Sequence, residues 1–441
     1  MVKLYKSYKK YCINKINTIL SKKLTKDKYK NNPNNFLRTR KMSFENVVLY
    51  GLNKKGLTSK MEIEEFTELI NMTDISSPAV LKQRLKLNGE IYLDMMQENL
   101  KGFYTEFKEE VRLFKGHILC AIDGSDFEIP NTKVTRNTYN KLHVNECVAR
   151  ASVSNMFDVL NHYVLDTVIG IYDNSERKMA RENLNNVKML EFPYPIIRIM
   201  DRGYTSLPEM YYADKNNDKF IVRLQNKDFK KQIEQMQSND EIITIPYQYD
   251  RVRYYKKNYP EFYREIEENK SDIKIRIVKI ENKDGERIIL ATNLPKDSFN
   301  YDEMIELYKL RWEIELNYHC IKESLKIETI TSSNDIIIYQ DIYSQMLAYN
   351  LIQAFKQDAE RKIDQTKYKH QMKINMNMAV GFVKKSLIKI IIENDEKKQN
   401  EMLRLLEKKI EKYLIPIKRD RHFPRNNSKK NKYSLNKRKS F

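Results

Sequence analysis

The stretch "HILCAIDGS", residues 117–125, begins as an apolar run and ends in a carboxylate followed by Gly-Ser. The apolar run predicts a buried β-strand, which we expect to end at Asp123. Two further runs, "RASVSNMFDVLN" (residues 150–161) and "HYVLDTVIGIY" (residues 162–172), predict two more strands close enough to form a meander.

A helix and a fourth strand complete this pattern. "SERKMARENLNNVKML", residues 175–190, is predicted to be a helix capped at Ser175. "YPIIRIMDRGY", residues 194–204, predicts a strand that ends at Asp201. Three strands, a helix and another strand indicate a mixed α/β sheet.

The segment from about residue 215 to 295 is again rich in predicted strands and resembles an insertion. Its Asp284-Gly285 pair is a hairpin turn signal. Asn300 is predicted to cap the helix that follows, and residues 331–416 are predicted to be helical.

The N-terminal part, up to about residue 105, is predicted to be a small helical module. Ser59 and Glu62 have capping-box spacing, and Ser77 is predicted to cap a helix with Pro78 at its first position. We expect the latter helix to present Lys82, Gln83, Arg84 and Lys86, as a helix-turn-helix-like DNA reader would. Basic surface helices without this function are also common.

These observations divide the chain into four expected parts. They are a basic arm with a helical DNA-end-binding module (1–105), a catalytic domain with the insertion (106–330), a helical region (331–416) and a basic tail (417–441).

The net charge of +20 is concentrated at the two ends of the chain. Residues 1–41 hold 13 Lys or Arg and one acid, and residues 418–441 hold ten and one, so the remainder is close to neutral. Such ends suit a polyanion, most simply nucleic acid. An anionic membrane and a merely solubilising tail are the alternatives, but the tail has no amphipathic repeat.

Several classes of protein are disfavoured by composition. No run approaches the ~18 apolar residues of a membrane span, and the N-terminal segment lacks the apolar core of a signal peptide. We therefore expect a soluble protein that is not secreted. The four cysteines and six histidines show no zinc-site spacing, so oxygen ligands would have to hold most of any metal.

The segment "YKLRWEIELNYHCIK", residues 308–322, gathers polar groups beside an apolar stripe. At 100° per residue, an unbroken helix places Tyr308, Arg311, Glu315 and Lys322 within an arc of about 60°. An exposed Arg311–Glu315 pair, spaced i to i+4, is the simplest interpretation. A carboxylate within a phosphate-binding face is the functional one.

The three carboxylates together favour the functional interpretation. Asp123 and Asp201, each alone more often a turn or cap residue, would combine with Glu315 as oxygen ligands for Mg²⁺. Two such ions can activate a nucleophile and stabilise the leaving oxygen of a phosphodiester. Arg311 and Lys322 would then bind phosphates, while Tyr308 would donate a hydrogen bond or stack.

The same residues resemble a known family. Residues 308–322 match the Tyr-x2-Arg-x3-Glu-x6-Lys signature of prokaryotic DDE transposases of insertion-sequence family four. "AIDGS" (121–125) and "MDRGY" (200–204) resemble the first and second aspartate regions of that family. The β-rich segment corresponds to its insertion before the glutamate.

The resemblance implies an α/β fold with an RNase H-like mixed-sheet core, flanked by helical regions. It implies two Mg²⁺ ions, for which Mn²⁺ can substitute, held by Asp123, Asp201 and Glu315. Tyr308, Arg311 and Lys322 would contact double-stranded DNA, both terminal inverted repeats and target. A homodimer on DNA, located in the cytoplasm with the nucleoid and without a membrane partner, is implied as well.

Two other functions stay open at this point. A nuclease with the same core would carry the carboxylates without needing the Tyr308, Arg311 and Lys322 face. A non-catalytic DNA-binding descendant of a transposase would have lost a carboxylate, whereas all three are present. A tyrosine recombinase is disfavoured because no Arg/His constellation accompanies a tyrosine.

Overall fold

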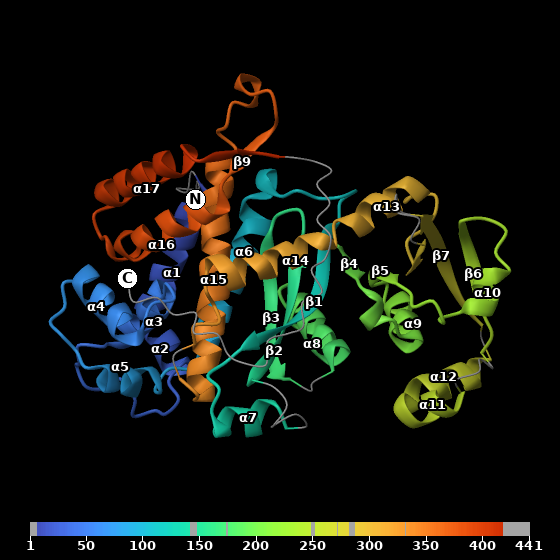
Figure 1. The fold of residues 1–441 in the computed structure, drawn as a ribbon, viewed down its shortest axis with the longest axis horizontal. Coiled ribbons are helices and arrows are strands. Elements are labelled where there is room, and N and C mark those ends of the chain that lie inside the picture. Colours follow the sequence, from blue (N-terminus) through green and yellow to red (C-terminus); the bar gives the residue numbers. More distant parts are fainter. Residues whose placement is uncertain are drawn as a thin grey trace.

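A mixed sheet of eight strands forms the centre of the computed structural model, which describes residues 7–141, 148–172, 175–247, 252–270, 272–281, 287–330 and 332–417 (Figure 1). The strand order is β3-β2-β1-β4-β5-β8-β7-β6. The strands are β1 (Ile118–Glu128), β2 (Arg150–Asp158), β3 (Tyr163–Ile171), β4 (Ile196–Met200), β5 (Lys219–Arg223), β6 (Asp240–Ile245), β7 (Ile273–Glu281) and β8 (Arg287–Thr292).

Strands β1 to β3 form the expected antiparallel meander, and β4 and β5 continue the sheet in parallel to β1. Helix α8 (Glu176–Lys188) connects β3 to β4 and packs on one face of β1, β2 and β3. Its N-cap residue is Ser175, as predicted. This topology confirms the mixed α/β, RNase H-like core expected from the sequence.

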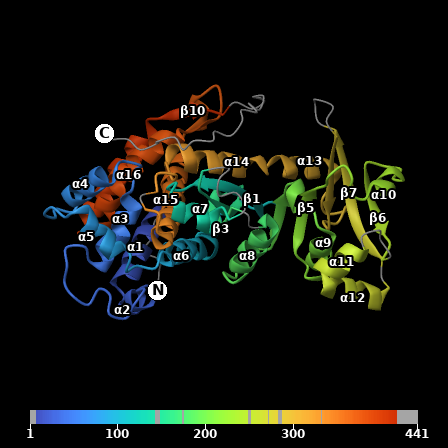
Figure 2. The ribbon, with the colours of Figure 1, turned by 60° about the horizontal axis from the view of Figure 1, so that its bottom comes forward.

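The segment after β5 extends the same sheet. Strand β8 pairs with β5, and β7 and β6 follow outward (Figure 2). Helix α9 (Leu207–Lys215), which precedes β5, packs on that strand. Helix α12 (Pro260–Asn269) contacts α9 through Phe262 and Tyr211, and α11 (Val252–Asn258) packs on α12. The expected strands are therefore present. A short helix, α10 (Lys230–Glu234), lies between β5 and β6 in the sequence. The predicted turn at Asp284-Gly285 lies outside the described residues.

A single long helix, α15 (Asp335–Glu360), organises the helical part of the molecule. It is buried on all sides, and a helix of that kind needs neighbours all around it. Those neighbours are β3, α1 (Tyr8–Ser21), α3 (Phe44–Asn53), α6 (Glu90–Glu106), α16 (Met376–Ile392) and α17 (Glu396–Glu411). Figure 1 shows α15 between the N-terminal helices, the C-terminal helices and the sheet.

The smaller elements fill the surface around these layers. They are α2 (Lys23–Lys28), α4 (Ser59–Leu69), α5 (Ser77–Arg84), α7 (Lys133–Tyr139), α13 (Tyr301–Lys309), α14 (Trp312–His319), and a two-stranded sheet of β9 (Met372–Ile374) and β10 (Leu414–Pro416).

The N-terminal basic region is folded where the structure describes it. Helix α1 packs on α6, α15 and α16, and Lys9 is only 5% exposed. Its ammonium lies 3.2 Å from Asp358 and 2.7 Å from Glu407. Residues 7–21 therefore form part of the helical body rather than an extended arm.

Two predicted helix caps are wrong by one residue. Thr58 and Ser76 hold the N-cap positions of α4 and α5, so Ser59 and Ser77 are already helical. Glu62 makes no capping box, because its carboxylate instead accepts hydrogen bonds from the backbone of the preceding loop.

Helix α5 does not present the predicted basic face to solvent. Gln83 and Arg84 are buried, with Arg84 only 3% exposed. The guanidinium of Arg84 donates to Asp341 on α15 at 2.5 Å, because the helix turns this side toward the core. Lys86 lies beyond the end of α5 and donates to Gln83. Of the four predicted residues, only Lys82 is thus an exposed residue of the helix.

Among the described residues, no helix combines the length and apolar content needed to cross a bilayer. Cys12, Cys120 and Cys320 are free thiols. Cys147 lies outside the described residues.

We predict that Asp341 is essential for stability. Its carboxylate accepts hydrogen bonds from Lys54 at 2.7 Å and Arg84 at 2.5 Å, and all three side chains are buried. Asp341→Asn should lower the free energy of unfolding by about 3–5 kcal/mol, because it removes the negative charge that two buried cations contact. Urea denaturation measures the change.

The matched control is Glu401→Gln. Glu401 pairs with Arg404 at 2.6 Å on the surface, with both side chains about half exposed. Such pairs contribute little, so this variant should unfold at the parental midpoint. Equal effects of the two substitutions would contradict the proposed role of burial.

Candidate active site

The register of two parallel strands brings Asp123 and Asp201 together. Ala121 on β1 pairs with Ile199 on β4. Asp123 lies two residues further along β1, and Asp201 lies two residues beyond Ile199, directly after β4. Neighbouring strands are about 4.8 Å apart, so the two carboxylates start from adjacent points of the sheet.

Strand β1 is longer than predicted, so Asp123 lies within it and not at its end. Pairing with β2 continues through Glu128, whereas pairing with β4 stops at Ala121. Strand β2 thus supports β1 beyond the point where β1 and β4 separate. Asp123 lies just after this point of separation. Asp201 directly follows β4, as predicted.

The two aspartates affect each other electrostatically. Burial, followed by the nearby carboxylate of Asp201, raises the pKa of Asp123 to about 7. The backbone N–H of Gly124, at 2.9 Å, and the charge of Arg311 oppose this rise. Asp201 accepts a hydrogen bond from the backbone N–H of Gly203 at 2.7 Å.

The segment predicted as one helix over residues 308–322 is broken. Helix α13 begins with a capping box between Asn300 and Glu303, which confirms the predicted cap, and it ends at Lys309. Helix α14 starts at Trp312, and residues 320–324 form a π-helical turn. The break consists of tighter i to i+3 hydrogen bonds at residues 310–314.

The break changes which of the predicted residues lie together. Arg311 donates to Glu315 at 2.8 Å, and its guanidinium lies 6.0 Å from the ring centre of Tyr308. Both ionic side chains are partly buried, at 14% and 26% exposure. Arg311 and Glu315 also lie close enough to Asp123 to influence its pKa. These three residues, with Tyr308, share one site.

Lys322 lies further along β1. Its ammonium donates to the backbone carbonyl of Asp126 at 2.6 Å and lies 5.0 Å from the centre of the Phe127 ring. It is also 3.8 Å from Glu328. Lys322 thus contacts β1 three residues beyond Asp123. The π-helical turn places it on a different side of the helix from Arg311 and Glu315.

Tyr318 was missed by the sequence analysis, although it lies three residues after Glu315. Its buried hydroxyl lies 2.8 Å from the carbonyl oxygen of Asp123 and 3.1 Å from that of Val153, and accepts from the backbone N–H of Asn155. Helix α14 is thereby fixed to β1 and β2. The side chain that holds Glu315 near Asp123 is an uncharged tyrosine, so no charge pattern could reveal it.

Glu176 and Tyr204 were also missed. Glu176 is the first residue of α8, and burial together with the carboxylates of Asp201 and Asp126 raises its pKa. Tyr204 is 4% exposed, and no described residue is hydrogen-bonded to its hydroxyl. The sequence predicts Glu176 only as part of the start of a helix and Tyr204 only as part of the turn after a strand.

The donor set fits a divalent cation, although no three His, Cys, Asp or Glu side chains among the described residues already stand at metal-binding spacing. Glu315 is instead held by Arg311. Gly124 and Gly203 leave open space beside the carboxylates that a Cβ would fill. The unpartnered hydroxyl of Tyr204 adds a buried polar atom at the same place.

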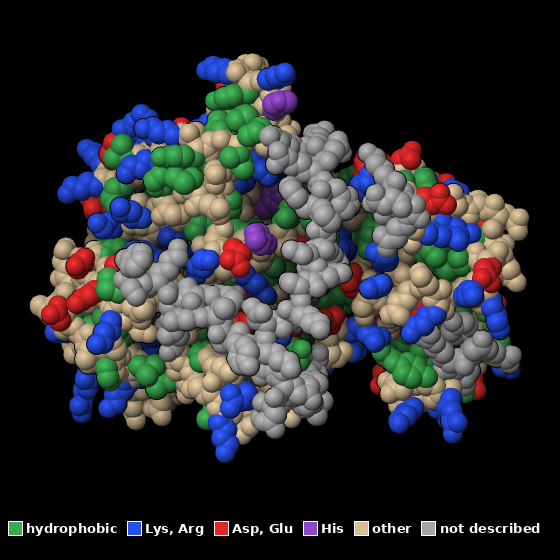
Figure 3. Space-filling view, viewed as in Figure 1, with side chains coloured by type: hydrophobic (Ala, Val, Ile, Leu, Met, Phe, Trp, Pro, Cys, Tyr) green, Lys and Arg blue, Asp and Glu red, His purple; other side chains and the backbone are tan. Residues whose placement is uncertain are grey.

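Basic residues border the site. Figure 3 shows a hollow between the part with β1–β4 and the part with β5–β8, with acidic side chains inside and Lys and Arg at its borders. Next to Asp201, a cavity of about 380 Å³ is lined by Arg202, Arg223, Leu224, Gln225, Asn226 and Lys227. Such a border suits a polyanionic ligand.

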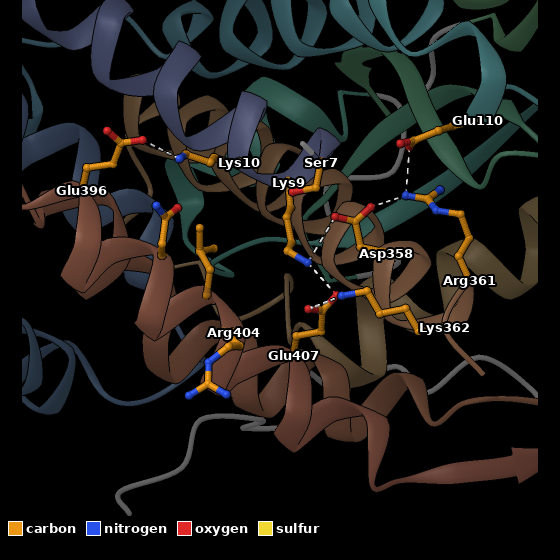
Figure 4. Close-up of a pocket in the computed structure, with 12 residues that line it drawn as sticks. Ser7, Lys9, Lys10, Glu110, Asp358, Arg361, Lys362, Glu396, Arg404 and Glu407 are labelled. Carbon is orange, nitrogen blue, oxygen red and sulfur yellow. Dashed lines mark hydrogen bonds and ion pairs between the residues drawn. The ribbon is translucent and has the colours of Figure 1, made fainter. Parts of the chain in front are cut away.

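A second charged cavity, of about 540 Å³, lies between α1, α15 and α17 (Figure 4). Its cations are held by neighbouring acids, for example Lys10 by Glu396 at 2.7 Å and Lys362 by Glu407 at 2.7 Å. This internal compensation indicates a structural network that joins the chain ends.

Comparison with known proteins assigns the family. The family model described as "Transposase DDE domain" matches residues 115–351, which is more than half of the chain. The chain therefore belongs to this family. The matched range contains Asp123, Asp201 and Glu315.

Curated relatives agree with this assignment. Transposase InsG for insertion sequence element IS4, from Escherichia coli (strain K12), is 20% identical over 305 residues, 66% of this chain and 65% of the relative. A protein of Synechocystis sp. (strain ATCC 27184 / PCC 6803 / Kazusa), named for insertion sequence element IS4SA, is 26% identical over 192 residues, 42% and 49% of the two chains. Each relative is thus spanned over less than two thirds of its length. The resemblance to insertion-sequence family four is confirmed.

Among solved structures, the cryo-EM structure of the piggyBac transposase synaptic complex with hairpin DNA is similar over 90% of this chain and 85% of that chain. The sequence identity is 8% and the TM-score is 0.44. A TM-score below 0.5 does not by itself establish a shared fold.

We predict that, without metal, the ionised carboxylate of Asp123 lowers the free energy of unfolding in a pH-dependent way. The folded-state pKa of about 7 exceeds the unfolded value of about 3.9, so the folded state binds this proton more tightly. This destabilisation is absent below pH ~4, grows as pH rises, and is complete above pH ~7. Asp123→Asn should remove it and stabilise the protein at pH 7.5 by at least about 1 kcal/mol.

Urea unfolding in EDTA from pH 4.5 to 8 measures this effect. Asp297→Asn, at an exposed position, is the control and should leave the pH profile unchanged. A gain for Asp123→Asn that is equal at every pH would show that the proton affinity of Asp123 is not its cause.

We also predict that Tyr318 positions α14. Tyr318→Phe should cost about 1–3 kcal/mol of stability, because it leaves the buried N–H of Asn155 without its partner. Tyr368→Phe, at a residue 42% exposed, should leave stability unchanged. Parental stability of Tyr318→Phe would reject the positioning role.

Proposed function

We propose that the protein is a DNA transposase that cleaves DNA at insertion-sequence ends and joins the freed strand to target DNA. One observation carries the proposal: Asp123 and Asp201 each lie two residues beyond Ala121 and Ile199, which pair on parallel strands, and Tyr318 fixes the helix of Glu315 beside them. All of these residues lie within the range matched by the transposase DDE family.

Asp123, Asp201 and Glu315 would hold divalent metal, on which the family depends. We propose two Mg²⁺ ions, with Mn²⁺ able to substitute, because these hard cations prefer carboxylate oxygens. The chemistry that bound ions supply is activation of the attacking oxygen and stabilisation of the leaving oxygen of a phosphodiester. For Glu315 to serve, its ion pair with Arg311 has to open.

The cations around the carboxylates would orient the DNA. Arg311, once free of Glu315, can bind a phosphate through two N–H groups, and Tyr308 beside it can donate a hydrogen bond or stack. Arg202, Arg223 and Lys227 border the other side of Asp201. Lys322 contacts β1 in the absence of DNA, so its predicted DNA contact requires the side chain to turn away from Asp126.

The partners follow from this function. We propose double-stranded DNA, both terminal inverted repeats and target, a homodimer assembled on it, and a cytoplasmic location with the nucleoid. The basic residues 418–441, outside the described residues, would add affinity without sequence preference. Short inverted repeats flanking the gene would support transposition over a nuclease function.

We predict that each of Asp123→Asn, Asp201→Asn and Glu315→Gln reduces strand cleavage by several orders of magnitude. Each removes a charge that in-line phosphoryl transfer requires at the metal site. Binding to DNA should survive, because the basic border of the site is untouched. Nicking, strand transfer and binding are measured in parallel on duplex DNA carrying the element's terminus, with Mg²⁺ or Mn²⁺.

The control is Glu306→Gln, an exposed residue on α13, which should cleave at the parental rate. Near-parental cleavage in one of the three variants would remove that residue from the site. Cleavage by all three would reject the proposed mechanism, and nicking without any strand transfer by the parent would favour a nuclease.

A further inference from the structure

The carboxylate of Glu176 lies between two glycines of the site. A Cβ added to Gly124 would lie 3.5 Å from Oε1 of Glu176, and one added to Gly203 would lie 3.5 Å from its Oε2. The same Cβ position at Gly203 is 3.1 Å from Oδ1 of Asp201. The two carboxylates therefore lie side by side across Gly203.

The strand geometry explains how Glu176 reaches this place. Side chains alternate between the two faces of β1. The Asp123 carboxylate lies near Arg311 and Glu315, whereas Gly124 faces Glu176 on α8. Glu176, at the start of α8, approaches the site from the face opposite Glu315. The absent side chains at Gly124 and Gly203 leave room for this approach.

A second observation points to a missing ligand at the same place. The hydroxyl of Tyr204 is buried, and no hydrogen bond joins it to any described residue. Its surroundings are the carboxylates of Asp123, Asp201 and Glu176, which influence it electrostatically. Tyr204 belongs to the turn directly after Asp201, on which α8 packs. Buried hydroxyls normally have partners, so this one indicates a bound species that would complete the site.

We propose that Glu176 is a fourth carboxylate of the divalent-metal centre and binds the ion held by Asp201. Its two oxygens face Gly124 and Gly203, which carry no side chain. The bound ion or its water would also satisfy the hydroxyl of Tyr204. This inference rests on the proposed function, because that function supplies the metal.

The alternative explanation is that Glu176 only stabilises the start of α8. Acidic residues in the first helical turn interact favourably with the helix dipole. That role requires no metal, so metal affinity separates the two explanations.

The experiment is a calorimetric titration of the full chain with MnCl₂, without DNA. We expect Glu176→Gln to weaken Mn²⁺ binding at least tenfold, in common with Asp201→Asn. Glu182→Gln, on an exposed position of the same helix, is the matched control and should bind Mn²⁺ with parental affinity. Thermal unfolding without metal shows whether each variant is folded.

The outcomes separate this inference from the proposed function. Parental Mn²⁺ affinity for Glu176→Gln, with a loss for Asp201→Asn, would overturn the role of Glu176 and leave the proposed function intact. If Asp123→Asn and Asp201→Asn also bind Mn²⁺ with parental affinity, the metal site itself would be overturned.

A second variant covers the case in which Glu176→Gln does not fold. Glu176→Asp keeps an acidic group in the first turn of α8 but shortens the side chain by one methylene. We expect it to fold with parental thermal stability and to bind Mn²⁺ more weakly, because its carboxylate is withdrawn from Gly203. Parental affinity in this variant would overturn the proposal.

Discussion

Two carboxylates on neighbouring parallel strands repel each other, and much of the structure around Asp123 and Asp201 serves to tolerate this repulsion. Burial raises the pKa of Asp123, and this repulsion adds to the rise. Backbone N–H groups of Gly124 and Gly203 each donate to one of the two carboxylates, and Arg311 supplies a positive charge nearby. The same repulsion makes the pair a strong attractor for cations, which is what a metal centre requires.

The elements that could be predicted are those whose signal is local. The apolar runs before Asp123 and Asp201 identified the two central strands, and Asn300 identified the start of α13. The order of strands and helix then left few possible sheets. The end of β1 was misplaced because strand length depends on the partner strand, and β2 supports β1 beyond Asp123.

The parts that could not be predicted depend on contacts between distant residues. Tyr318 reaches a carbonyl 195 positions earlier in the chain, and Arg84 is bonded to Asp341, 257 positions later. No helical wheel distinguishes such a buried tyrosine from a core residue, or such an arginine from one that binds DNA. The prediction that Tyr308, Arg311, Glu315 and Lys322 share one helical face was wrong for a similar reason. It assumed a regular α-helix, whereas the chain has i to i+3 hydrogen bonds at residues 310–314 and a π-helical turn at residues 320–324.

Helix α15 has a consequence for how this chain is made. The N-terminal helices and β3 pack on a helix that begins only at Asp335, and Lys9 is paired with Glu407, 398 positions later. While the ribosome is still translating the sheet, these surfaces have no partner, and their apolar side chains remain uncovered. The polypeptide therefore completes its helical body only near the end of synthesis, so a shortened product lacking α15 would not hold the carboxylates in place.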